Sequence, residues 1–245
     1  MKVLGLTLAL LVLLGLRLDL HHGLGPRGTD GQYYYAQARS LVVDGDLDLR
    51  RELGELTPRP ENVNTSTDRP WDEPTATGRV PCKYPVGAPL LQVPFLAVGQ
   101  LLALGLDAAG VEVRTDGYSA PCYLAWRVGV WAFATLLLWA AAGFARRVTG
   151  LGPEAGMACA AAAVLCGPLL YFCTGDPYSA HVHSAALVAA ALLLAVDPAA
   201  LPRRLRGTAP LWIGLCCGLA VCTRATNGLW LGAAGLLLLL GGAPD

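Results

Sequence analysis

Three ionisable residues stand directly beside apolar segments of this sequence, and each has a side chain that can do chemistry. Asp30 follows the first apolar run, Asp176 stands in a short segment between two later runs, and Arg224 interrupts the nearly apolar residues 209–243. A carboxylate can act as a general base, and the planar fork of a guanidinium matches a phosphate. An arginine between apolar runs is costly unless it is paired or reaches water, so Arg224 indicates a functional site.

Tyrosines follow Asp30 at helical spacing. Tyr33 and Tyr34 stand three and four residues after Asp30, which puts all three on one face of a helix. We expect that helix to run from about residue 30 to residue 43 and to end at Asp44-Gly45. The pattern places a carboxylate just outside a membrane entry, with aromatic side chains next to it.

Two further polar residues stand where apolar segments begin. Lys83 precedes the apolar residues 84–106 and is a candidate for binding an anionic headgroup, while His181 opens the apolar run 179–196. Because His181 and His183 are two residues apart, a regular helix cannot present both to one metal ion. One of them can face the other helices.

Each of these residues also has a structural use, which the sequence leaves open. Asp30 suits the first turn of a helix, where the macrodipole favours an acid, and the tyrosines suit a membrane interface. Asp176 lies between glycine and proline, as in a turn. Lys83 and His181 can be interfacial residues, and Arg224 can snorkel to the membrane edge.

The composition is that of a membrane protein. Hydrophobic residues make up 54% of the chain and charged residues only 15%, against about 25% charged in soluble domains. The formal net charge is zero, which argues against a nucleic-acid partner. Residues 19–120 hold 14 of the 18 acidic and 9 of the 18 basic residues, so the polar chemistry is concentrated there.

Apolar runs predict an all-α, polytopic membrane helix bundle of about six spans with a large outer loop. We expect residues 1–20 to form the first span, 21–119 an extracytoplasmic loop carrying interfacial helices, and 120–245 a transmembrane bundle. The spans of that bundle are predicted near residues 128–145, 155–174, 179–196, 209–222 and 228–243. A re-entrant hairpin is an alternative for the last two.

Basic residues predict the orientation. Lys2, Arg146-Arg147 and the cluster at residues 203–206 all face the cytoplasm only if residues 84–106 do not cross the membrane. We therefore expect residues 84–106 to lie at the outer interface or against the bundle, an interpretation that their prolines favour. Asp30, Asp176 and Arg224 then share the outer side of the membrane. Arg127, near the outer end of the second span, is expected to snorkel.

Eight cysteines show no metal-ligand spacing. Six lie in apolar runs and are interpreted as small packing residues. Cys82 and Cys122 lie in the polar stretch, where an oxidising compartment would permit a disulfide between them. The sequence decides neither this pairing nor a metal requirement.

The motifs together resemble the GT-C superfamily of membrane glycosyltransferases, which includes the protein mannosyltransferases and the aminoarabinose transferases. The resemblance covers most of the chain in order. It begins with the first span and the motif Thr29-Asp30-Gly31-Gln32-Tyr33-Tyr34 that follows it. It continues with the motif Lys83-Tyr84-Pro85-Val86-Gly87-Ala88-Pro89-Leu90 and with His181 at the mouth of a span. It ends with Gly214 to Gly218, which lead to Arg224-Ala225-Thr226-Asn227. Family members are usually longer, so this chain resembles their N-terminal part.

The resemblance implies transfer of a sugar from a polyprenyl-phosphate donor to an acceptor outside the cytoplasm. Asp30 matches the catalytic base, although the family often has a second acid next to it and Gly31 stands there in this sequence. Asp176 occupies a place comparable to that of the second acid found in a later outer loop. Basic residues hold the lipid phosphate in the family, and Arg224 and Lys83 are the candidates. His181, Tyr33 and Tyr34 complete the expected substrate-binding set.

We therefore expect an integral membrane glycosyltransferase, of a bacterial inner membrane, with its active site on the extracytoplasmic side. The expected partners are the bilayer and a polyprenyl-phosphate sugar donor, with an acceptor that the sequence does not identify. The alternatives are a multispan transporter or flippase of a lipid-linked substrate, and a non-catalytic truncated relative. Transporters usually carry internal repeats, and we see none.

Overall fold

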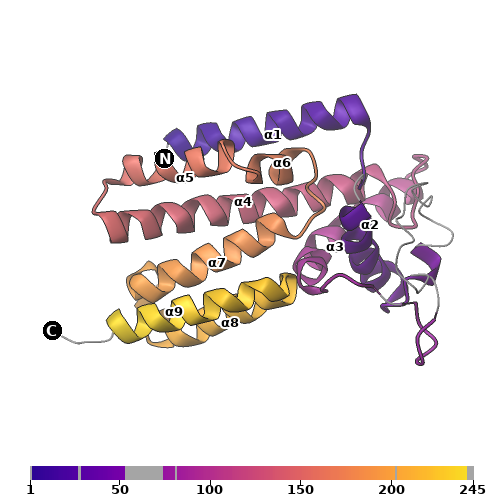
Figure 1. Cartoon of the computed structure of the whole chain (residues 1–245). Coiled ribbons are helices and arrows are strands. Elements are labelled where there is room, and N and C mark those ends of the chain that lie inside the picture. The colour runs from indigo at the N-terminus through magenta and orange to yellow at the C-terminus, as the bar shows by residue number, and fades with distance from the viewer. Residues whose placement is uncertain (1, 27–28, 53–73, 81, 202, 242–245) are drawn as a thin grey trace. The chain divides into compact units, whose positions relative to one another are not determined.

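The computed structural model describes residues 2–26, 29–52, 74–80, 82–201 and 203–241. Every regular element in these ranges is helical, which confirms the expected all-α class (Figure 1). The α-helices are α1 (Lys2–His22), α2 (Thr29–Arg39), α3 (Gly87–Ala108), α4 (Ala120–Thr149), α5 (Pro153–Leu165), α6 (Leu169–Thr174), α7 (His181–Val196), α8 (Ala209–Thr223) and α9 (Gly228–Gly241). Shorter helical segments are η1 (Ser40–Asp44), η3 (Pro198–Ala200), η4 (Arg203–Thr208) and η5 (Ala225–Asn227).

The chain divides into two compact units. Unit 1 comprises Met1–Leu18, Val130–Gly175 and Ala180–Asp245. Unit 2 comprises Asp19–Gly129 and the short segment Asp176–Ser179. The acid-rich stretch that the sequence singles out therefore belongs to unit 2, and so does the turn that carries Asp176.

Four helical segments are long and apolar enough to cross a membrane. They are α1, α3, α4 and the segment Arg203–Thr223, which joins η4 to α8. The membrane character expected from composition is supported by these segments, but the expected number of six spans is not confirmed. Helices α7 and α9 have 16 and 14 residues, short of the roughly 20 residues that a perpendicular crossing needs.

The span expected at residues 155–174 is broken into two short helices. Helix α5 ends at Leu165 and α6 begins at Leu169, with Pro168 at its N-cap position. Proline lacks a backbone N–H and its ring clashes with the preceding turn, so a helix running through Pro168 would lose hydrogen bonds. Residues 155–174 are nearly all apolar on both sides of the break, which explains why their composition predicts a single span.

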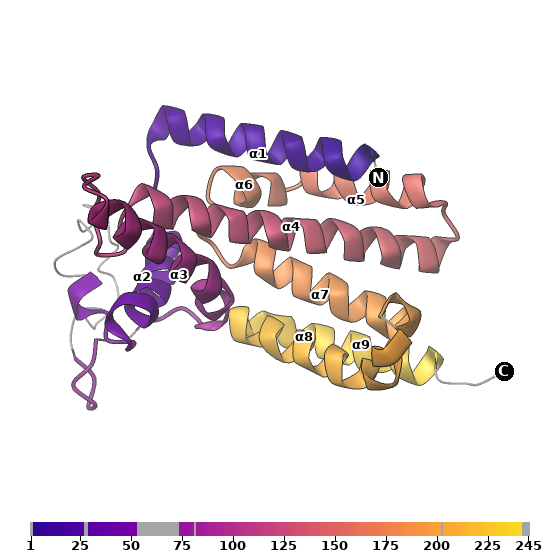
Figure 2. The same ribbon diagram turned by 180° about the vertical axis from the view of Figure 1, so that it is seen from behind.

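Helix α3 was expected to lie along the outer interface, as part of residues 84–106. Its 22 residues are long and apolar enough to cross, and length and composition do not distinguish the two placements, so the interfacial placement stays a prediction. One face of α3 is buried in unit 2, where it packs against α2 (Figures 1 and 2). Gly99 on α3 permits close packing, because a Cβ there would lie 2.7 Å from the Cα of Cys122.

Helix α2 forms much as the sequence predicts. It runs from Thr29 to Arg39, continues as the π-helical turn η1 and ends at Gly45, whose φ of +77° is left-handed. Glycine adopts that conformation at little cost, and it commonly ends helices for this reason. The helix beginning at Thr29 places Asp30 in its first turn, as expected.

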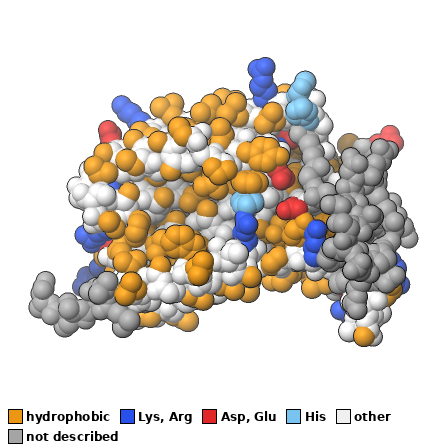
Figure 3. Space-filling model, in the orientation of Figure 1, with side chains coloured by type: hydrophobic (Ala, Val, Ile, Leu, Met, Phe, Trp, Pro, Cys, Tyr) orange, Lys and Arg blue, Asp and Glu red, His pale blue; other side chains and the backbone are white. Residues whose placement is uncertain are grey.

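In unit 1, helices α7, α8 and α9 lie side by side (Figures 1 and 2). Their contact is made mainly by small and branched side chains, namely Ala191, Leu194, Ala195, Ile213, Cys217 and Ala234. Large apolar side chains on the outer faces of these helices stay exposed, as Figure 3 shows in orange; Leu211 is 69% and Leu229 84% exposed. Outward-facing leucines of this kind are typical of helices that contact lipid.

Candidate functional site

In unit 2, the candidate base Asp30 is bound by a tyrosine. The carboxylate of Asp30 is exposed in the first turn of α2, and its Oδ1 accepts a hydrogen bond from the hydroxyl of Tyr84. The burial of Tyr84 raises the pKa of its hydroxyl, and the nearby carboxylate of Asp30 raises that pKa further. Tyr84 therefore stays protonated and remains a hydrogen-bond donor to Asp30 at neutral pH.

Three of the other expected site residues gather around Tyr84. The rings of Tyr33 and Tyr34 have their centroids 5.3 Å and 5.2 Å from that of Tyr84. The Nζ of Lys83 lies 5.0 Å from the Tyr84 ring centroid and 6.0 Å from that of Tyr33, within range of a cation–π interaction. Asp30, Tyr33, Tyr34 and Lys83 thus meet around Tyr84, a residue that the sequence argument did not assign to the site.

Asp176 is the second acid of this group. Its Oδ1 is buried and makes no hydrogen bond within the described residues. Burial raises the pKa of Asp176; the backbone N–H of Tyr178 opposes this shift, and the negative charge of Asp30 adds to it. The two acids are therefore close enough to influence each other, although the chain separates them widely.

Gly31 explains how Asp176 approaches α2. A Cβ at position 31 would lie 3.0 Å from Oδ1 of Asp176 and 2.8 Å from the Cβ of Tyr178. Gly31 has no positive φ, so its value in this place is the space that it leaves rather than its conformational freedom. The glycine that follows the candidate base Asp30 is thus the residue against which Asp176 packs.

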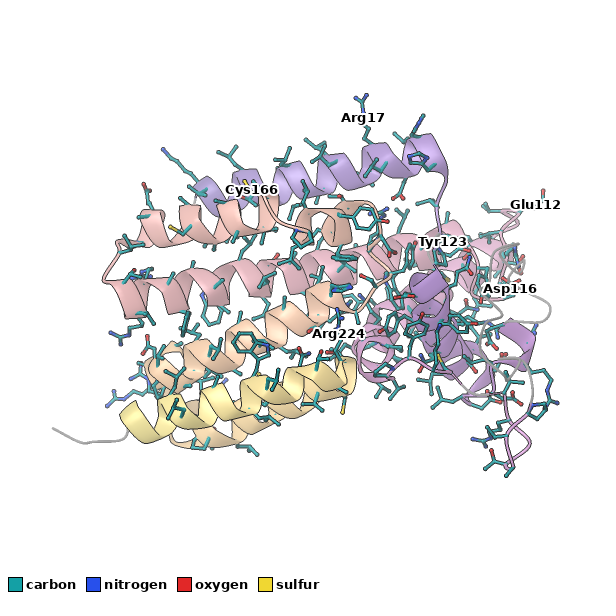
Figure 4. The ribbon with its side chains drawn as sticks, in the orientation of Figure 1. Arg17, Glu112, Asp116, Tyr123, Cys166 and Arg224 are labelled. Atoms are coloured by element: carbon teal, nitrogen blue, oxygen red, sulfur yellow. The ribbon has the colours of Figure 1, made fainter. Side chains whose placement is uncertain are left out.

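Buried contacts hold α2 in place. Arg39, at the end of α2, is fully buried and donates hydrogen bonds to Oε1 of Glu52 at 2.7 Å and to the carbonyl oxygen of Asp116 at 2.7 Å (Asp116 is labelled in Figure 4). The hydroxyl of Tyr35 donates to the carbonyl oxygen of Gly117 at 2.5 Å. These bonds fix the helix that carries Asp30 against the rest of unit 2.

In unit 1, Arg224 contacts His181 where α8 ends (Figure 4). Nη1 of Arg224 lies 2.5 Å from Nδ1 and 3.2 Å from Nε2 of the imidazole, so the guanidinium donates to the ring nitrogen that lacks a proton. The ring of Phe172 stacks on His181, with centroids 3.8 Å apart and planes 15° apart. Within the described residues no carboxylate lies within ion-pair distance of Arg224.

A cavity of about 440 Å³ adjoins this pair in unit 1. Three polar residues, His181, Ser184 and Asn227, line it, and the remaining lining is apolar and comes from α4, α6, α7 and α9. The side-chain amide of Asn227 donates to Oγ of Ser184 at 2.7 Å and to the carbonyl oxygen of Ala220 at 2.7 Å. The Ala220 carbonyl also accepts the backbone N–H of Arg224 at 3.0 Å, so Asn227 adds a side-chain bond at the point where α8 ends.

The structure thus groups the predicted residues into two sets. Asp30, Tyr33, Tyr34, Lys83 and Asp176 belong to unit 2, whereas His181 and Arg224 belong to unit 1. The functional role of every one of these residues stays a prediction, and so does the expectation that Asp30 and Arg224 act on one lipid headgroup. Sequence reasoning missed Tyr84, Phe172 and Asn227; Tyr84 lies inside the Lys83-Tyr84-Pro85 motif and was the easiest of the three to find.

The expectation that Arg127 snorkels is wrong. Its side chain is only 1% exposed and forms an ion pair with Asp19, which is also buried. Asp19 lies at the end of the first apolar run and Arg127 precedes the expected span 128–145, so the opposite charges at the ends of these two runs could have predicted the pair.

Neither a disulfide nor a metal cluster forms among the described residues. Cys82 accepts a hydrogen bond from Gln37 at 3.0 Å, and Cys122 donates one to Gln100 at 3.5 Å, so the two cysteines have separate partners. No group of three His, Cys, Asp or Glu side chains in the described part of the chain has a metal-binding arrangement.

Comparisons with family models, with curated proteins and with solved structures find no match to this chain. The geometry of the two sets of residues therefore carries the functional argument.

Proposed function

We propose that the protein is a membrane glycosyltransferase that moves a sugar from a polyprenyl-phosphate donor to an acceptor hydroxyl on the extracytoplasmic side of a bacterial inner membrane. The observation that supports this most is the exposed carboxylate of Asp30, bound by a tyrosine that stays protonated. An exposed acid with a fixed orientation suits a general base that must reach a substrate.

The proposed reaction balances with Asp30 as base. Asp30 takes the proton of the acceptor hydroxyl, the oxygen attacks the anomeric carbon, and the bond from that carbon to the phosphate oxygen breaks. The polyprenyl phosphate leaves with the bonding electron pair. Tyr84 orients the carboxylate through its hydroxyl and also packs against the rings of Tyr33 and Tyr34. Aromatic rings are common platforms for the faces of sugars.

Asp176 has a distinct role in this proposal. Burial raises the pKa of Asp176, and the negative charge of Asp30 adds to this shift, so the fold favours the protonated form of Asp176. We therefore assign the role of base to Asp30, the exposed acid of the two.

We assign Arg224, in unit 1, to the phosphate of the lipid-linked donor. Arg224 has no carboxylate partner in the described residues, and its contact with His181 leaves the guanidinium charge uncompensated. A fixed guanidinium stabilises the charge that develops on a leaving phosphate. The mainly apolar cavity that includes His181 suits the first carbons of a polyprenyl chain.

The first experiment compares Asp30→Asn with Asp107→Asn in membrane vesicles supplied with radiolabelled polyprenyl-phosphate sugars and a membrane extract as the source of acceptors. Asp107 is an exposed acid of the same unit, at the end of α3, and serves as the matched control. We expect Asp30→Asn to lower donor consumption by roughly 10²-fold or more, since general bases contribute about 10²–10⁴. Asp107→Asn should leave it unchanged.

Full donor consumption by Asp30→Asn would reject Asp30 as the base. Passage of intact donor across the vesicle membrane without transfer would identify a flippase and reject the transferase. Arg224→Gln is compared in the same assay with Arg17→Gln, an exposed arginine of α1 (Figure 4). A raised KM for the donor is expected only for Arg224→Gln.

A further inference from the structure

A second cavity lies in unit 1, away from the residues considered above. Its volume is about 440 Å³, and its lining comes from the C-terminal half of α4, the end of α7 and η3. The lining residues are Trp139, Gly143, Arg146, Arg147, Leu151, Leu193, Asp197 and Ala200. The positions of its arginines are those that the positive-inside rule assigns to the cytoplasmic face.

The cavity has a polar end and an apolar end. Arg146 and Arg147 lie in the last turn of α4, and Trp139, which is 46% exposed, lies two turns earlier on the same helix. Seven residues of helix span about 10 Å, so the arginines and Trp139 lie at different depths along α4. Gly143 lies between them and lets Leu193 of α7 come close, since a Cβ at position 143 would lie 3.0 Å from both Cδ atoms of Leu193.

The polar end carries a positive charge. Arg147 forms a bidentate ion pair with Asp197, with Nε to Oδ2 and Nη2 to Oδ1 both at 2.9 Å. Arg146 has no acid within ion-pair distance in the described residues, so its charge is not compensated. The charge of Arg206 also reaches this end, because it contributes to the lowered pKa of Asp197. Three arginines against one aspartate leave an excess of positive charge.

Contacts with the protein restrain Arg146 and Arg206 before any ligand binds. The stem of Arg146 packs against α5, where its Cγ lies 2.5 Å from the position of a Cβ on Gly156. Arg206 donates to the carbonyl oxygens of Leu201 at 3.4 Å and Ala199 at 3.5 Å, the two neighbours of Ala200 in the cavity wall. Side chains ordered in advance lose less entropy when they bind.

We propose that this cavity binds the phosphate of an anionic phospholipid headgroup, with Arg146 as its principal ligand and Trp139 beside the upper part of the acyl chains. The geometry favours a lipid over a free anion because the charge stands at one end of a cavity whose other end is apolar. Basic pockets between membrane helices on the cytoplasmic side commonly hold anionic headgroups, and tryptophan favours the interface. Figure 3 shows basic side chains gathered at the end of unit 1 where α4 and α7 end.

The test is native mass spectrometry of the full chain in detergent, titrated with phosphatidylglycerol or with phosphatidylcholine of the same acyl chains. The wild type should bind phosphatidylglycerol more tightly than phosphatidylcholine. Arg146→Gln and, independently, Arg206→Gln should each weaken phosphatidylglycerol binding about fivefold. Arg17→Gln, which removes an exposed arginine of α1 in the same unit, should not change it.

Equal binding of the two lipids by the wild type would overturn the proposal. So would an effect of Arg17→Gln as large as that of Arg146→Gln, since the attraction would then be general rather than local. Displacement of the lipid by millimolar inorganic phosphate would show a site for small anions and would overturn the assignment to a lipid. Arg206→Gln keeps the test decisive if Arg146→Gln does not fold.

Discussion

Gly31→Ala tests the close approach of Asp176 and Tyr178 to α2. An added Cβ would lie 2.8 Å from the Cβ of Tyr178, whereas carbon atoms in contact prefer about 3.5–4.0 Å. The Cβ of Tyr178 cannot turn away by a change of rotamer, because it is attached to the backbone. The segment that carries Asp176 and Tyr178 must therefore move by the better part of an ångström, and Asp176 must move with it.

The expected magnitude comes from two opposed effects. Alanine is a better helix former than glycine by up to about 1 kcal/mol, and overpacking a closed site costs about 1–3 kcal/mol. Gly105→Ala is the matched control, because Gly105 lies in helix α3 of the same unit and has open space at its Cβ position. The propensity gain is common to both variants, so Gly31→Ala should be less stable than Gly105→Ala by about 1–3 kcal/mol.

Thermal unfolding of the purified variants in a mild detergent measures this difference. For a protein of this size 1 kcal/mol corresponds to roughly 2–4 °C in Tm. Gly105→Ala should melt at or above the wild-type temperature, and Gly31→Ala below it. If both variants melt together, Asp176 and Tyr178 do not pack against Gly31, and the reasoning about the second acid fails.

Three further outcomes follow from the contacts of unit 2. Asp176→Asn should raise Tm more at pH 7 than at pH 4. Folding raises the pKa of Asp176, so this carboxyl costs stability as the pH rises above its pKa in the unfolded chain. Equal gains in Tm at both pH values would contradict the burial of the carboxyl. Tyr84→Phe should lower donor consumption roughly tenfold and leave Tm nearly unchanged, because only the hydrogen bond to Asp30 is lost. Unaltered donor consumption would exclude Tyr84 from the site. Arg127→Gln should lower the free energy of unfolding by about 3–5 kcal/mol, because it leaves the charge of Asp19 buried without its partner. Replacing both partners, Asp19→Leu with Arg127→Met, should recover most of this stability. A double variant no more stable than the single one would show that the buried charge of Asp19 costs little.

Local patterns in the sequence predicted the parts of the site that depend on neighbouring residues. The helix after the first apolar run was predicted because its end has a clear signal in Asp44-Gly45. The positions of Tyr33 and Tyr34 near Asp30 followed from helical spacing alone. These features need no knowledge of what packs against the helix, so a single sequence suffices for them.

Contacts between distant segments were the main failure. Arg127 was expected at the membrane edge because an isolated arginine beside an apolar run usually snorkels, yet it is buried against Asp19. The single helix expected at residues 155–174 is interrupted for a related reason, since the apolar composition of that segment does not register Pro168, where the helix breaks. A single ion-pair partner in the first case, and a single proline in the second, determine the local structure more strongly than the apolar composition of the segment.

Gly31 shows why the proximity of Asp30 and Asp176 could not be predicted from neighbouring residues in the sequence. In the sequence, a glycine beside Asp30 indicates a backbone conformation that other residues avoid. The φ of Gly31 is not positive, however, and the residue instead leaves room for a neighbouring side chain. That space is occupied by Oδ1 of Asp176, from a turn far along the chain. Any residue with a Cβ at position 31 competes with Asp176 for this place, so an acid at position 31 and Asp176 in its observed position exclude each other. The glycine at position 31 and the position of Asp176 beside α2 are therefore one structural feature, and only a three-dimensional contact reveals it.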